Sequence, residues 1–264
     1  MPPAKKRKKR GYDSDKTRTA VLTQFAHVRE AVAALTPGQL ALPAGLGDWT
    51  VRELTAHLCM GVESVGRALE QPAPPVAEVG LPEWAFATAA VAVPISDDVK
   101  AYAASAEPAE LFERTADRIA ELLGDTPPGR LIGVRVGAMT LGDFLVTRAV
   151  ELVVHTDDLN RAAGLDIPLD RQALAACTRL LADALAEKAP GASTEVRIPP
   201  YAVVQCVEGP RHTRGTPPNV VETDPVTWLR LATGRTTWAE ALASAQVSAS
   251  GERADLGGLL PVMS

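Results

Sequence analysis

The sequence predicts an α + α/β protein, with a bundle of α-helices over about residues 16–190 and a small α/β domain over about residues 193–264. Two observations lead to this fold class. Long segments of the first part repeat apolar residues at intervals of three and four, the period of an amphipathic helix. After Pro190-Gly191 the elements become short and rich in β-branched residues. The length of 264 residues agrees, because about 150 residues is typical of one domain.

The charge of the chain is unevenly distributed. The net charge is −5, yet six of the 27 Lys and Arg residues form one run, Lys5–Arg10. This run lies in a polar stretch, residues 1–15, that we expect to be a disordered tail. From residue 11 onward the chain carries 21 basic and all 32 acidic residues, a balance of −11, which argues against a nucleic-acid-binding domain. We favour a solvated tail over contact of the run with nucleic acid or an anionic membrane surface.

The sequence lacks membrane, secretion and disulfide signals. No run of about 18 apolar residues is present, and no apolar segment follows the N-terminal charges as in a secretory signal. Cys59, Cys177 and Cys206 are odd in number and far apart, so neither a disulfide framework nor a CxxC metal site is expected. We interpret Cys59 as a core residue, because no activating partner is evident locally. A reducing, cytoplasmic setting is predicted, and no obligate protein partner is indicated.

The first part begins with two amphipathic helices. The helix expected over Lys16–Leu35 stops before Pro37-Gly38. A second helix begins at Thr50, whose spacing to Glu53 is that of a capping box. Their apolar stripes consist of Val21, Phe25, Val28, Val32 and Leu35 in the first helix and Val51, Leu54, Leu58, Val62, Val65 and Leu69 in the second.

Proline-rich breaks separate the remaining helices of the bundle. Residues 71–100 are rich in Pro and Ala, and we expect a long excursion there with one short helix. Helices are expected over residues 108–123, over residues 141–163 with Thr140 as N-cap, and over residues 171–188. The segment 141–163 is apolar on most sides, which predicts a helix buried in the middle of the bundle.

Short elements make up the C-terminal part. Residues 194–208 have the β-branched content of strands, and residues 246–250 alternate as a strand does. Asp224-Pro225 is a suitable N-cap and first residue for a short helix. Thr237 and Glu240 have the spacing of a second capping box.

Three polar residues stand on helix faces that are otherwise apolar. His57 lies in the apolar stripe of the second helix. Glu151 and His155 are four residues apart, so their side chains project from one face of the helix expected over 141–163. A carboxylate on an interior face is costly unless it is paired or bound to a metal. Two imidazoles and one carboxylate match the ligand set of a catalytic zinc site whose fourth position is open.

The spacing alone leaves other interpretations open. Glu151 could form a salt bridge with Arg148, or an exposed i,i+4 pair with His155. A histidine in an apolar stripe is more often a hydrogen-bonded core residue than a metal ligand. Asp157 and Asp158 could orient an imidazole N–H of a metal ligand, or they could be ordinary acids on the helix surface.

Two segments resemble a known family. The stretches LGDWTVRELTAHL and MTLGDFLVTRAVELVVHTDDL resemble the two signature stretches of the mycothiol-dependent maleylpyruvate isomerase family. This resemblance covers most of residues 16–165 and implies a DinB-like helical bundle. It also implies a divalent metal, usually zinc, bound by a His of the first stretch and a Glu and a His of the second. His57, Glu151 and His155 occupy those three positions.

The C-terminal part carries a related resemblance. The segment DPVTWLRLATGRTTWAEALASAQVSASG is similar to the end of sterol-carrier-type domains. The whole arrangement resembles the actinobacterial sterol carrier family proteins, in which a bundle of the isomerase type precedes a small sterol-carrier-like domain. The expected fold is therefore a DinB-like bundle followed by a sterol-carrier-like α/β domain, although this domain is short for a lipid tunnel.

The resemblance implies a metal-dependent enzyme that uses mycothiol or a similar small thiol. A metal-bound thiol loses its proton near neutral pH. The resulting thiolate would add to an activated double bond, as in an isomerase, or displace a leaving group, as in an S-transferase. The alternative is a non-enzymatic protein that binds a sterol, lipid or other apolar small molecule in its C-terminal domain, with a structural or vestigial metal site.

An acidic small-molecule substrate would need a cation in the site. Arg148 lies one turn from the proposed ligands and is the first candidate. The loop EGPRHTRGTPPN offers Arg211 and Arg214, unless it is simply a solvated connection. The family places an arginine of the C-terminal domain in the metal cleft, and Arg197, Arg211 and Arg214 fit that position equally well by sequence.

Overall fold

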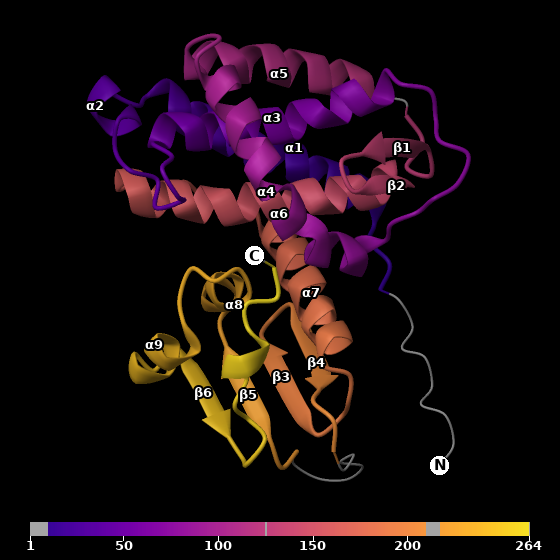
Figure 1. Ribbon diagram of the computed structural model, residues 1–264, viewed down its shortest axis with the longest axis vertical. Coiled ribbons are helices and arrows are strands. Elements are labelled where there is room, and N and C mark those ends of the chain that lie inside the picture. The colour runs from indigo at the N-terminus through magenta and orange to yellow at the C-terminus, as the bar shows by residue number, and fades with distance from the viewer. Residues whose placement is uncertain (1–9, 125, 210–216, 264) are drawn as a thin grey trace.

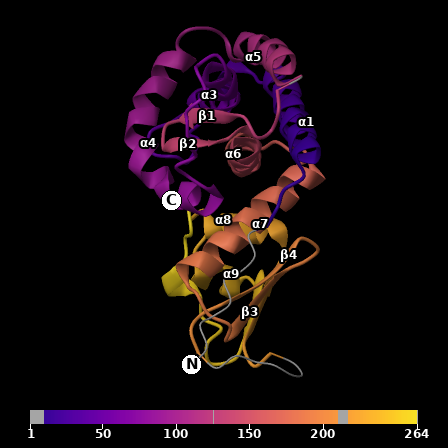
Figure 2. The same ribbon diagram turned by 90° about the vertical axis from the view of Figure 1, so that its right-hand side faces the viewer.

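The computed structural model describes residues 10–124, 126–209 and 217–263, and it shows a helical bundle and a small sheet domain joined by a helix (Figures 1 and 2). The bundle contains α1 (Ser14–Ala33), α2 (Pro37–Leu40), α3 (Val51–Leu69), α4 (Leu81–Ala103), α5 (Pro108–Leu123), the hairpin β1 (Leu131–Val134) and β2 (Gly137–Thr140), and α6 (Leu141–Ala163). The joining helix is α7 (Arg171–Lys188). The sheet domain contains β3 (Thr194–Ile198), β4 (Ala202–Cys206), β5 (Val220–Thr223), α8 (Pro225–Ala232), α9 (Trp238–Ala243), β6 (Val247–Ser250) and the 3₁₀ turn η1 (Gly257–Leu259). This architecture confirms the predicted fold class.

Helix α6, which carries two of the three candidate ligands, runs through the middle of the bundle. Thr140 caps it by accepting a hydrogen bond from the backbone N–H of Asp143 at 3.1 Å. The helix packs against α1, α3 and α7 and is buried on most of its sides. Helix α1 begins at Ser14, earlier than expected, because the side chain of Asp13 accepts a hydrogen bond from the backbone N–H of Lys16. None of the helices in the described ranges combines the length and apolarity needed to span a bilayer.

The expectation for residues 71–100 is wrong. In place of a long excursion with one short helix, Leu81–Ala103 form the 23-residue helix α4. Pro82 stands in the first turn, where a helix tolerates proline. The alanine-rich sequence that follows favours a helix, because alanine has the highest helix propensity. Helix α4 packs against α3 and α7 and closes one side of the bundle (Figure 2).

The C-terminal sheet has the strand order β4-β3-β5-β6. Strand β3 pairs antiparallel with β4 and parallel with β5, and β5 pairs antiparallel with β6. The β-branched stretch expected over residues 194–208 thus forms two strands, and the sequence did not suggest β5. Alternate residues of β3 and β4 are buried, which gives the sheet one interior face. Trp228 of α8 is buried in this domain.

Helix α7 packs against both halves of the structure. It contacts α1, α4 and α6 in the bundle and β4 and α8 in the sheet domain. Near its middle, Asp183 forms an ion pair with Arg10 at 2.8 Å. The other residues of the basic run, Lys5–Lys9, lie outside the described residues.

Replacing Asp170 by alanine is expected to lower the free energy of unfolding by about 1 kcal/mol. The Asp170 carboxylate accepts hydrogen bonds from the backbone N–H groups of Gln172 at 2.9 Å and Ala173 at 2.8 Å, and so caps α7. Urea denaturation measures the change. The control is Asp166→Ala in the exposed preceding loop, for which a change within about 0.5 kcal/mol is expected. Equal losses in the two variants would contradict the capping role.

Candidate metal centre

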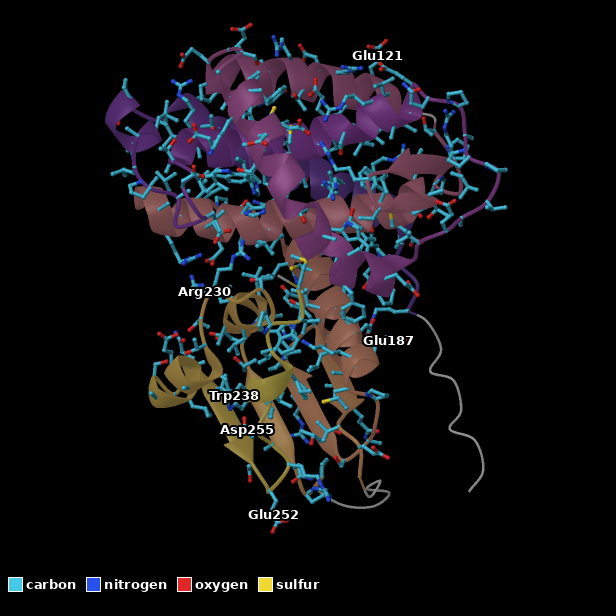
Figure 3. All side chains as sticks on the ribbon, viewed as in Figure 1. Glu121, Glu187, Arg230, Trp238, Glu252 and Asp255 are labelled. Atoms are coloured by element: carbon cyan, nitrogen blue, oxygen red, sulfur yellow. The ribbon has the colours of Figure 1, made fainter. Side chains whose placement is uncertain are left out.

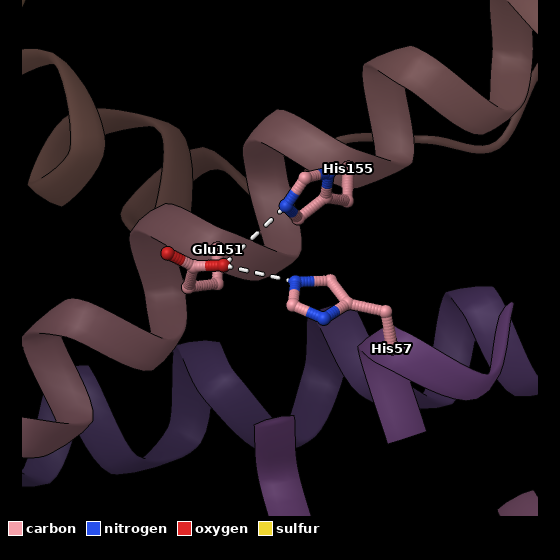
Figure 4. Close-up of side chains that lie close together, drawn as sticks. All are labelled: His57, Glu151 and His155. Carbon is pink, nitrogen blue, oxygen red and sulfur yellow. Dashed lines mark hydrogen bonds and ion pairs between the residues drawn. The ribbon is translucent and has the colours of Figure 1, made fainter. Parts of the chain in front are cut away.

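Two facing helices bring His57, Glu151 and His155 together (Figure 4). His57 stands on α3, and Glu151 and His155 stand on successive turns of α6. The Oε2 atom of Glu151 lies 3.4 Å from Nε2 of His57 and 3.4 Å from Nε2 of His155. The candidate ligand atoms of the three residues all lie within 4.8 Å of one another. A single divalent cation could therefore contact all three, and nitrogen and oxygen donors of this kind suit zinc.

The three side chains form an interior cluster. Their exposed fractions are 15% for His57, 19% for Glu151 and 12% for His155. A cavity of about 10 Å³ lies among them, which is about the space needed for one water molecule. Glu151 and His155 are therefore not an exposed surface pair.

Asp158 fixes the orientation of His155. Its Oδ2 atom lies 2.9 Å from Nδ1 of His155, and its side chain is fully buried. The Nδ1–H therefore donates to Asp158, and Nε2 faces Glu151. Burial lowers the pKa of His155, but the hydrogen bonds to Asp158 and Glu151 outweigh this effect and raise it. Burial also raises the pKa of Asp158, but His155 and Arg235 hold that pKa far below its ordinary value. Of the two roles that the sequence left open for Asp158, the structure thus favours the contact with the imidazole.

The protonation states of His57 and Glu151 suit metal binding. Burial lowers the pKa of His57, and the hydrogen bond to Glu151 offsets this only in part. Its Nδ1 atom is buried and has no hydrogen-bond partner among the described residues. Burial raises the pKa of Glu151, but the hydrogen bonds from the two histidines and the charge of Arg148 hold it well below its ordinary value. A neutral imidazole and an ionised carboxylate are the forms that bind a divalent metal.

Arg148 supplies a positive charge beside the cluster. Its guanidinium lies over the ring of Phe144, 4.6 Å from the centroid, and its Nε donates to the hydroxyl of Thr147 at 3.2 Å. Gly61 of α3 faces the guanidinium, since a β-carbon at this position would lie 3.5 Å from Nη1 of Arg148, an ordinary van der Waals contact. Within the described ranges no ion pair joins Arg148 to a carboxylate, so the alternative salt bridge to Glu151 is not formed.

A cleft of about 1190 Å³ adjoins the cluster. The residues His57, Glu151, His155 and Arg148 line it from the bundle, and Arg235 lines it from the C-terminal part. Concave sites of this kind between two structural parts are frequent ligand-binding sites.

Two arginines of the C-terminal part bind consecutive carboxylates of α6. Arg230, which stands between the two parts in Figure 3, donates through Nε and Nη2 to Asp157 at 2.9 and 2.7 Å. Arg235 donates through Nη2 and Nε to Asp158 at 2.8 and 3.2 Å. Two-point contacts of this kind are strong and directional. The C-terminal part is thereby linked to the carboxylate that holds His155.

The sequence did not single out these two arginines. Nothing in their segment, LRLATGR, shows that this part of the chain faces α6. Arg197 lies on β3, where it pairs with Glu195 at 2.7 Å, and it is not among the residues that line the cleft. Arg211 and Arg214 lie outside the described residues.

The three cysteines of the native chain are expected to resist a thiol reagent such as dithionitrobenzoate. Cys59, Cys177 and Cys206 are all buried. Burial raises the pKa of Cys59 to about 11, and it also raises the pKa of Cys177. The thiolate is the reactive form, so all three should react only after denaturation in guanidinium. A thiol that reacts rapidly in the native chain would contradict this and would indicate a nucleophile of the chain itself.

Comparison with known proteins identifies the bundle. A family model described as mycothiol maleylpyruvate isomerase N-terminal domain matches residues 21–160, more than half of the chain. The chain belongs to this family. A second family model, described as bacterial SCP ortholog, matches residues 170–262, which begin just before α7 and include the sheet domain. The match confirms the resemblance on which the ligand assignment rests.

The solved structure of a mycothiol-dependent maleylpyruvate isomerase shows the same fold. The crystal structure of the mycothiol-dependent maleylpyruvate isomerase aligns with a TM-score of 0.58 and 17% identity over 92% of this chain and 95% of that chain. A histidine-to-alanine mutant of that isomerase gives the same values. YfiT from Bacillus subtilis, described as a probable metal-dependent hydrolase, aligns with a TM-score of 0.34 and 22% identity over 62% of this chain and 97% of that chain. A search of curated proteins finds no significant match.

Proposed function

We propose that the chain is a metal-dependent isomerase or S-transferase that uses mycothiol or a similar small thiol and acts on a small, electrophilic, acidic substrate. The observation that carries this proposal is the interior cluster of His57, Glu151 and His155 on α3 and α6. Membership of the mycothiol maleylpyruvate isomerase N-terminal domain family supports the thiol. Zinc is the metal that the nitrogen and oxygen donors suit best.

The residues present fit such a metal. The Nε2 atoms of His57 and His155 and an oxygen of Glu151 converge on a cavity with room for about one water-sized ion or molecule. Asp158 holds His155 by its Nδ1, so that Nε2 is directed to the cavity. When bound, the metal would lower the pKa of a thiol so that the thiolate is present near neutral pH.

The chain's own residues would bind and orient the substrate. The guanidinium of Arg148 lies beside the cluster without a carboxylate partner in the described ranges, so it can hold a negatively charged group of the substrate. Arg211 and Arg214 remain candidates for a second contact. The cleft walls would limit the access of water to the bound reactants.

The carrier-like alternative has less support. The C-terminal match to a bacterial SCP ortholog favours it, but large side chains fill the interior of this domain, because Val196, Ile198, Trp228 and Leu229 are at most 1% exposed. A metal-loaded chain that binds fluorescent fatty-acyl probes but no thiol would favour a carrier.

The proposal is tested by the zinc content of the full chain after incubation with zinc and gel filtration. We expect close to one zinc per wild-type chain and loss of zinc in His57→Ala. The control variant His27→Ala, which changes a histidine of α1 outside the cluster, should keep its zinc. In the cobalt-loaded chain, adding mycothiol should produce a thiolate-to-cobalt absorption band. A folded wild-type chain that cannot be loaded with metal would refute the proposal.

A further inference from the structure

The cleft beside the cluster is larger than a small diacid requires. Its volume is about 1190 Å³, whereas ligand pockets typically measure about 300–1,000 Å³. A thiol cofactor and a second molecule of appreciable size can therefore occupy it together. The apolar surface and the charges of the cleft decide what that second molecule is.

One side of the cleft next to the cluster is apolar. Trp49, Met60, Ile95 and Tyr102 are half-buried and line the cleft, and we call them the apolar wall. They pack together on a small buried cluster of Ala56, Val99 and Ala103. The ring of Trp49 lies 5.1 Å from the ring of His57, so the wall begins beside a candidate metal ligand.

The apolar wall is already ordered and needs no polar partner from a ligand. The indole N–H of Trp49 donates to the hydroxyl of Ser96 on α4 at 3.0 Å. Its polar atom is therefore satisfied, and the rest of the indole is left as apolar surface facing the cleft. A ligand with an apolar ring would cover this surface and displace water from it.

The charges that line the cleft leave one cation available. Three of its four described arginines are engaged by carboxylates, namely Arg67 by Glu63 at 2.9 Å, Arg135 by Asp98, and Arg235 by Asp158 at 2.8 Å. Arg148 has no carboxylate partner in the described part of the chain. It also lines the small cavity at the cluster. The described cleft therefore offers one unpaired guanidinium for an anionic group, on the cluster side.

We propose, building on the proposed function, that the substrate sharing the cleft with the thiol is a monocarboxylate with an apolar, ring-sized body. Its carboxylate binds Arg148 and its body lies against the apolar wall. Because His57 neighbours both Trp49 and Arg148, the substrate atoms between carboxylate and body lie next to the cluster. Among the described residues of the cleft, a small dicarboxylate would find one arginine without a carboxylate partner for its two carboxylates, and it would leave the apolar wall in contact with water.

The test compares three probes by calorimetry on the zinc-loaded full chain: 2-naphthoate, its neutral analogue 2-naphthamide, and maleate. We expect 2-naphthoate to bind at least about 10-fold more tightly than maleate, because the naphthyl ring buries apolar surface on the wall. It should bind about 10-fold more tightly than 2-naphthamide, because its carboxylate pairs with a guanidinium. Maleate binding as tightly as 2-naphthoate would overturn the proposal.

Three variants assign these preferences to the named residues. Arg148→Met should remove the preference for 2-naphthoate over 2-naphthamide and leave 2-naphthamide binding unchanged. Ile95→Asn should weaken both naphthyl probes and leave maleate unchanged. Phe86→Asn, which changes an exposed apolar residue of the same helix outside the cleft, should alter none of the three. Unchanged 2-naphthoate binding in both Arg148→Met and Ile95→Asn would also overturn the proposal.

The outcome separates this inference from the proposed function. A wild-type chain that binds zinc and prefers maleate would overturn the substrate class and leave the proposed function standing. A wild-type chain that cannot be loaded with zinc would overturn the proposed function, whichever probe binds better.

Discussion

Replacing Glu151 by glutamine is expected to lower the affinity for zinc by at least about 100-fold. Loss of a residue that only supports a metal ligand costs up to about 100-fold in metal affinity, and loss of a ligand should cost at least as much. Glutamine has nearly the shape of glutamate but no charge. The low pKa of Glu151 keeps the native carboxylate ionised, and its Oε2 atom is placed 3.4 Å from the Nε2 atoms of both His57 and His155. The variant would keep the two imidazoles but lose the carboxylate. The negative charge of that carboxylate is what favours binding of a divalent cation.

The matched control for this prediction is Glu63→Gln. Glu63 stands on α3 and has 17% of its side chain exposed, close to the 19% of Glu151. Its partners are Arg67 and Arg118, and it contacts neither histidine. Competition with a chelator measures the zinc affinity, and thermal unfolding with and without zinc gives a second readout, because a bound metal stabilises the folded chain. Unchanged zinc affinity in Glu151→Gln would show that this carboxylate is not a ligand.

Replacing Arg235 by alanine is expected to weaken zinc binding by about 10- to 100-fold although this residue is not a candidate ligand. Arg235 donates two hydrogen bonds to Asp158, and Asp158 in turn accepts the Nδ1–H of His155. Without Arg235 the Asp158 side chain keeps, among the described residues, only Arg161 and His155 as partners, so the imidazole is held less firmly. We also expect a loss of about 3 kcal/mol in unfolding free energy, because the variant breaks a buried ion pair.

Arg230→Ala is the control that separates these two effects. It breaks a similar two-point contact, from the same C-terminal segment to the neighbouring residue Asp157, whose side chain is 6% exposed. Asp157 makes no contact with His57, Glu151 or His155 in the described structure. We therefore expect a comparable loss of stability and an unchanged zinc affinity.

The conservative variant Arg235→Lys refines this comparison. Lysine keeps the charge but cannot make the two-point contact, so an intermediate zinc affinity is expected. Equal losses of zinc affinity in Arg230→Ala and Arg235→Ala would show that the C-terminal part acts by general stabilisation. No loss in Arg235→Ala would show that Arg161 is sufficient to hold Asp158.

Local geometry explains which parts of the site could be predicted. Residues four apart on a helix share a face whatever surrounds the helix, so Glu151 and His155 could be paired from their spacing. The start of α6 was predictable for the same reason, since Thr140 caps a backbone N–H only three residues away. That His57 joins the pair depends on the packing of α3 against α6, and the sequence suggested it only through the polar residue in an apolar stripe and the family resemblance.

Helix α4 shows where local sequence signals pointed to the wrong structure. Prolines at the start of residues 71–100 indicated breaks, and they outweighed the helix propensity of the alanines that follow. The error matters for function, because Ile95 on α4 and Tyr102 near its end supply half of the apolar wall. The size and polarity of the cleft could not be derived without this helix.

By itself the sequence determined the order of two structural parts and the faces of the helices, and it placed three polar residues on apolar faces, because these features follow from periodicity and capping over a few residues. The assignment of those three residues to one cluster also needed the family resemblance. Only the tertiary structure decided how the cluster is supported. The contact between Arg235 and Asp158 spans 77 positions of the chain, and no local pattern encodes which arginine meets which carboxylate over such a distance. The same holds for the pairing of three cleft arginines with carboxylates, which leaves Arg148 as the cleft arginine without a carboxylate partner in the described part of the chain.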